Sequence, residues 1–91
     1  MKASFRKLTI RPTLTGEPEV NDLTDLVANV VYQTAMNFAQ HTLAHRIAES
    51  GEEGIELTEE DKKTIKAALD QTTLRFFVKK PILEAIGEKF E

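Results

Sequence analysis

The sequence contains no cysteine, which excludes disulfide frameworks and thiolate metal sites. Its four glycines form neither GxGxxG nor GxxxxGK[ST], the two patterns whose backbone cradles phosphate groups. Serine occurs only at Ser4 and Ser50, and neither lies in a GxSxG nucleophile elbow. We therefore expect no catalytic residue and no cofactor, and the sequence favours a protein that is not an enzyme.

Charge is also missing from one long stretch. From Leu26 to His45 there is no Asp, Glu, Lys or Arg, although 30% of the chain is charged. The stretch has the length of a membrane span, but its Asn, Gln, Thr and His residues make it too polar to enter lipid. Because no apolar signal segment follows Lys2 either, we expect a cytoplasmic protein without membrane contact.

The size and charge of the chain limit its architecture and its partners. Ninety-one residues predict one domain, spanning 1–91, with a modest core that a second chain would help to complete. The net charge of −3 counts against nucleic-acid binding, which usually relies on a strongly positive surface.

The sequence pattern predicts a mainly α fold with a small β component. Residues 3–11 alternate as a strand, with Leu8 and Ile10 on one face, and a short strand at 55–57 is its expected partner. Basic and acidic side chains of the two segments would then face each other, namely Arg6, Lys7 and Arg11 against Glu52, Glu53 and Glu56.

Three helices are expected after a turn-rich connector at 12–21. A long central helix covers about 22–49 and begins at Asp22. A second covers about 59–79, because Thr58 and Asp61 resemble a capping box. Pro81 opens a short third helix, about 81–90. Residues 72–80 also fit a strand, and we favour the helix because Phe76 continues the apolar stripe from Ile65.

The long helix carries two apolar stripes at helical spacing. One contains Leu23, Val27, Val30, Val31, Thr34, Phe38, His41 and His45. The other, nearly opposite, contains Tyr32, Met36, Ala39, Leu43 and Ile47, and an uncharged polar wall of Asn29, Gln33, Asn37 and Gln40 lies between them. A helix that is apolar on two sides usually packs on two sides, so the second stripe is our candidate interface for a homodimer with antiparallel helices. The alternative is a single broad face that drifts around the helix axis.

Three potential metal ligands follow one another along the same helix. His41 and His45 are four residues apart, and Glu49 lies one turn further on. There is no HExxH arrangement. We favour a structural role, in which the two histidines close the apolar stripe as buried or half-buried residues hydrogen-bonded to the Asn and Gln wall or to a partner chain, and we expect no metal site.

Basic residues offer an alternative function. A basic patch around Phe77 could form if the N-terminal strand packed beside the second predicted helix. It would combine Arg6, Lys7 and Arg11 of the strand with Arg75, Lys79 and Lys80. Lys79 and Lys80, however, also suit the negative end of a helix dipole. A nucleic-acid-associated regulator is therefore the second hypothesis, and a metal-dependent enzyme using the histidines is the third.

Three segments in order, FRKLTIR, VYQTA and ELTEED, give the chain a layout that resembles small uncharacterised proteins of prophages and conjugative elements. The resemblance implies a bacterial or phage accessory protein that works by assembly, and it assigns no site residue. The first hypothesis is therefore a non-enzymatic structural or interaction protein that acts through self-association.

Overall fold

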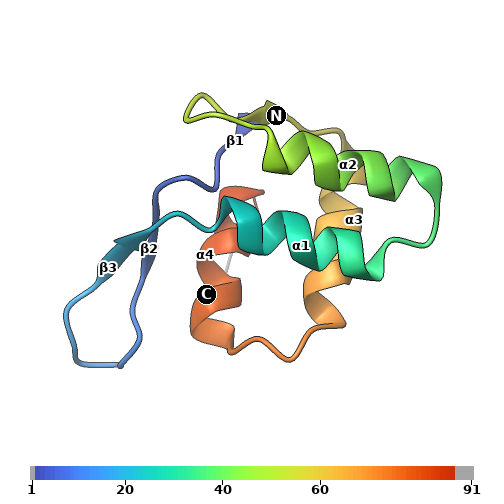
Figure 1. The fold of residues 1–91 in the computed structure, drawn as a ribbon. Helices are drawn as coiled ribbons and strands as arrows, with labels where there is room; N and C mark the ends of the chain where they lie inside the picture. The colour runs from blue at the N-terminus through green and yellow to red at the C-terminus, as the bar shows by residue number, and fades with distance from the viewer. Residues whose placement is uncertain (1, 88–91) are drawn as a thin grey trace.

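A computed structural model describes residues 2–87 of the chain as four helices and two small antiparallel sheets (Figure 1). The helices are α1 (Thr24–Thr34), α2 (Phe38–Ala48), α3 (Glu59–Asp70) and α4 (Phe76–Ala85). The strands are β1 (Lys2–Ala3), β2 (Leu8–Ile10), β3 (Glu19–Asn21) and β4 (Ile55–Glu56). The mainly helical prediction is confirmed. Within residues 2–87 no helix combines the length and the apolarity needed to cross a membrane.

The single helix predicted over 22–49 is wrong, because the chain turns back after Thr34 and a second helix begins at Phe38. The Asn37 side chain caps α2 by accepting the backbone N–H of Gln40 at 2.9 Å. The Gln40 Oε1 in turn accepts the backbone N–H of Met36 at 2.7 Å. These two bonds satisfy donors that a continuous helix would have bonded internally, and α1 and α2 lie side by side as a hairpin (Figure 1).

The turn merges the two predicted stripes into one core. Val27 and Val31 of α1 and Leu43 and Ile47 of α2 are all at most 2% exposed. In a straight helix these pairs would point in opposite directions, but reversing the chain directs both toward α3. A helix buried on two sides is therefore not the reason for the apolar content of this stretch.

The second and third helices also differ from the prediction. The capping box at Thr58 and Asp61 is confirmed, but α3 ends at Asp70 rather than at 79. α4 then begins at Phe76 and contains Pro81, so the helix expected over 81–90 starts earlier than predicted, and residues 88–90 lie outside the described range. The strand alternative for 72–80 is wrong as well.

Pro81 is the sixth of the ten residues of α4, so it lies in the helix interior rather than at the first position. Pro81 lacks an N–H and loses a bond to the carbonyl of Phe77, which belongs to the first turn. The next two residues, Ile82 and Leu83, are 0% and 7% exposed. Their burial outweighs the local preference against helix before proline.

The strand pairing is partly as predicted. The N-terminus does pair with residues 55–56, but through β1, in the register Lys2↔Glu56 and Ala3↔Ile55. β2 pairs instead with β3 of the connector, with Leu8 opposite Asn21. Of the predicted charge pairs, Lys7 and Glu52 meet at 3.4 Å.

Arg6 ties the N-terminal segment to both ends of the helix hairpin. Its guanidinium donates to the carbonyl of Ser50, after α2, and pairs with Asp22 at 3.1 Å, before α1. Asp22 also accepts the backbone N–H of Thr24 at 2.9 Å. The Thr24 bond, and after it Arg6, hold the pKa of Asp22 below its ordinary value. Phe5, next to Arg6, is 0% exposed and anchors the segment in the core.

Candidate interaction surfaces

The exposed part of the α1–α2 hairpin carries no charge between Leu26 and His45. We call its exposed residues the hairpin surface, which consists of Asn29, Tyr32, Gln33, Met36, Asn37, Phe38, Ala39, His41, Thr42 and His45. Core packing explains why the buried residues of this stretch are apolar. It does not explain why ten exposed positions lack charge.

Large apolar side chains stand out from this surface near the hairpin turn. Met36 and Phe38 are each 86% exposed, and Tyr32 is 53% exposed. Single exposed apolar residues are common on soluble proteins, but a group of them on an uncharged surface is typical of an interaction site.

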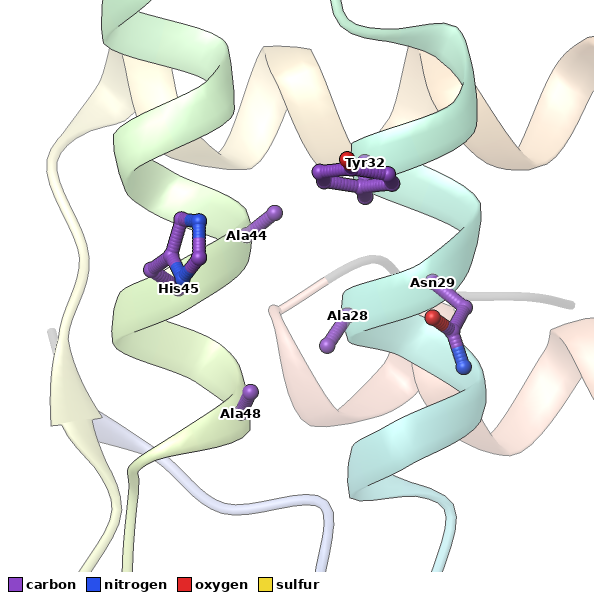
Figure 2. Close-up of a pocket in the computed structure, with 6 residues that line it drawn as sticks. All are labelled: Ala28, Asn29, Tyr32, Ala44, His45 and Ala48. Carbon is purple, nitrogen blue, oxygen red and sulfur yellow. The ribbon is translucent and has the colours of Figure 1, made fainter.

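A shallow groove of about 300 Å³ runs between α1 and α2 beside Tyr32 (Figure 2). Its lining includes three small residues, Ala28, Ala44 and Ala48, whose short side chains leave the space. Tyr32 from α1 and His45 from α2 stand on its two sides (Figure 2). The volume is at the lower limit for a small-molecule pocket and suits a single protruding side chain.

Three rings form a cluster on the hairpin surface. The ring centroids of His41 and His45 are 4.8 Å apart, and Tyr32 lies 5.1 Å from His41 and 6.4 Å from His45. Among residues 2–87, neither imidazole has a hydrogen-bond or ion-pair partner. The expected hydrogen bonds to the Asn and Gln wall are therefore not formed.

The third potential metal ligand does not join this cluster. Glu49 is the C-cap residue of α2. In the described part of the chain no three His, Asp or Glu side chains are arranged to hold a metal ion. One chain thus brings His41 and His45 together and supplies no third ligand beside them.

The predicted interface residues are divided between surface and core. Tyr32, Met36 and Ala39 are exposed, as an interface requires. Leu43 and Ile47 are 2% and 0% exposed and fill the core of their own chain, so they are not available to a second one. Phe38, which was not among the predicted interface residues, is exposed and belongs to the hairpin surface. The N-cap residue before it, Asn37, is the sequence signal that could have identified it.

A second concave region, which we call the cleft, lies between the β2–β3 hairpin and α4. Its volume is about 700 Å³, and its lining includes Arg11, Leu14, Phe77, Lys80 and Glu84. β2 packs against α4, which is the arrangement the predicted basic patch requires. Only part of that patch is assembled here, because Arg6 and Lys7 are paired elsewhere and Lys79 donates to the carbonyl of Thr72.

Comparisons of this chain with protein-family models, with curated proteins and with solved structures gave no match, so the candidate surfaces are argued from their residues alone.

Proposed function

We propose that this protein is a non-enzymatic interaction protein that acts by binding a second copy of itself through the hairpin surface. The observation that carries the proposal is the absence of charge from exposed positions that bear Met36, Phe38 and Tyr32.

The expected number of charges shows how unusual this surface is. At the overall charged fraction of 30%, ten positions would carry about three charged residues, and they carry none. Solubility alone would favour charge at exposed helix positions. The centres of protein interfaces are depleted of charge and enriched in Tyr, Phe and Met, because burying an unpaired charge is costly. The composition of the hairpin surface follows the interface pattern.

A second copy is the occupant that the rest of the molecule favours. A small domain has a limited core, and a twofold dimer lets one surface serve both chains. Two uncharged surfaces also approach each other without the repulsion that identical charged patches would meet. Ten residues are fewer than the roughly 20–30 per side of a standard interface, so the dimer should form at micromolar rather than nanomolar concentration.

Sedimentation equilibrium on paired variants tests the proposal. Phe38→Asp introduces a charge into the hairpin surface and should leave the protein monomeric. Leu14→Asp is the matched control, since Leu14 is 88% exposed but lies in the β2–β3 loop, and it should keep the wild-type mass. Both variants should retain the helical circular dichroism spectrum. A wild-type protein that stays monomeric at high micromolar concentration, or a Leu14→Asp variant that dissociates as readily as Phe38→Asp, would refute the assignment.

A second candidate function, binding of single-stranded nucleic acid, is favoured by one observation in the cleft. Arg11 and Lys80 line it together with Phe77, an arrangement suited to phosphate contact and base stacking. Glu84 in the same lining opposes it, and so does the net charge. A fluorescent oligonucleotide that binds at low salt and is released as salt rises would support this function, particularly if Phe77→Ala abolishes the binding. The absence of binding at low salt would count against it.

A further inference from the structure

We infer that His41 and His45 form half of a binding site for a divalent transition metal, and that the same two residues of a second copy complete it. The inference rests on the proposed self-association. It adds a ligand class, namely an ion such as Zn²⁺ held by four imidazoles.

The geometry of the pair suits chelation. With Zn–N bonds of about 2.0–2.1 Å and tetrahedral angles, the centroids of two ligating imidazoles lie roughly 5 Å apart. The centroids of His41 and His45 are 4.8 Å apart, with the rings tilted by 58° rather than stacked. Their spacing of four residues places both on one side of α2, so a small rotation of either side chain would bring one nitrogen of each onto a shared ion.

The surroundings leave both rings available. Neither imidazole hydrogen-bonds or ion-pairs with another residue of the described range, so a metal would displace no internal hydrogen bond or ion pair. Tyr32 packs against both rings and limits their rotation, which lowers the entropy lost when a ligand is bound. The neighbouring cation, Arg46, is directed elsewhere, since it pairs with Asp61 at 3.5 Å and donates to the carbonyl of Glu56 at 2.7 Å.

One chain does not complete the site. Structural zinc has four protein ligands and catalytic zinc has three, whereas the described residues offer two and no third beside them. Imidazole is a favoured ligand of Zn²⁺, Cu²⁺ and Ni²⁺. A twofold axis next to His41 and His45 would bring four imidazoles together, and the uncharged hairpin surface allows the two chains to approach that closely.

Sedimentation velocity of the full chain, first dialysed against EDTA and then titrated with Zn²⁺, tests the inference. The dimer fraction should rise and reach its limit at one zinc ion per two chains. When free zinc is at a hundred times the dissociation constant of the shared site, dimerisation should strengthen by roughly a hundredfold. Cobalt in place of zinc should give the intense visible absorption of tetrahedral coordination.

Two variants identify the ligands. The double variant His41→Gln, His45→Gln removes all four imidazoles and keeps the surface uncharged, so zinc should no longer raise its dimer fraction above its own metal-free value. Glu49→Gln should behave as the wild type. Loss of zinc binding in Glu49→Gln, or saturation at one ion per chain, would overturn the shared four-histidine site.

The result without metal separates this inference from the proposed function. A metal-free dimer that zinc does not alter would refute the metal site and leave self-association standing. A chain that stays monomeric with and without zinc would refute both. A chain that is monomeric without metal and dimerises only with zinc would support the shared site and refute association of the metal-free chain.

Discussion

The comparison of Leu43→Ala with Met36→Ala tests the helix hairpin most directly. The two residues are seven positions apart, so a continuous helix over 22–49 would expose or bury them together. In the hairpin, Leu43 is 2% exposed and Met36 is 86% exposed. Truncating a buried leucine costs about 2–5 kcal/mol, because its transfer energy is lost and a cavity remains. Truncating the exposed methionine should change the free energy of unfolding by no more than about 0.5 kcal/mol.

The leucine effect is large against the stability expected for the whole chain. A domain of this length is stable by about 5–14 kcal/mol, and each kcal/mol corresponds to roughly 4–8 °C in Tm. A loss near 3 kcal/mol would therefore lower the Tm of Leu43→Ala by about 12–24 °C. Thermal and urea unfolding, followed by far-ultraviolet circular dichroism at low protein concentration, would measure both variants with little contribution from association. Similar losses in the two variants, or a larger loss for Met36→Ala, would refute the hairpin.

Three further predictions concern local structure. Thr58→Ala removes the N-cap of α3 and should cost about 0.5–2 kcal/mol in urea unfolding, and no loss would show that the cap does not stabilise the helix. Gly54 has a φ of +84° and a Cβ there would clash with the carbonyl oxygen of Ala3, so Gly54→Ala should destabilise by at least about 1 kcal/mol. A Cβ at Gly51 would meet open space, so Gly51→Ala is the matched control. It should leave the free energy of unfolding unchanged or raise it by up to about 1 kcal/mol. The pKa of Asp22 is below its ordinary 3.8 in the folded chain, so its carboxylate stabilises the fold above that pH and loses this contribution as the pH falls through the lowered pKa. Asp22→Asn should therefore be less stable at neutral pH and lose less on acidification, and an acid titration parallel to that of the wild type would contradict this.

Hydrophobic periodicity identified the helical segments but not where the chain reverses. The stretch from Leu26 to His45 has no glycine or proline, and its apolar residues fit one helix or two. The decisive signal is Asn37 followed three residues later by Gln40, which resembles a helix-start signature in the middle of a helical pattern. At Pro81 the error was the opposite one, since a helix start was predicted where the helix continues. Local preference favours a helix start at this proline, and the burial of Ile82 overrides that preference. The capping box at Thr58 was predictable because its hydrogen bonds join residues close in sequence.

The candidate site was predicted only in part, for the same reason. Tyr32 before the turn and Met36 within it remain on the surface, whereas Leu43 and Ile47 come after the turn and are directed into the core. The pairing of His41 with His45 followed from spacing alone, because both belong to α2. The contact of Tyr32 with both rings crosses between helices, so it depends on the reversal of the chain.

The pairing of β1 with β4 has a consequence for how the chain folds as it is synthesised. Lys2 and Ala3 are translated well before their partners Ile55 and Glu56, which lie more than 50 residues further along the chain. The α1–α2 hairpin needs only a three-residue turn, so its contacts join segments that are close in sequence. Contacts between distant segments form slowly, because a long loop must be ordered first. β1 therefore leaves the ribosome before β4 and is among the last of these elements to reach its place.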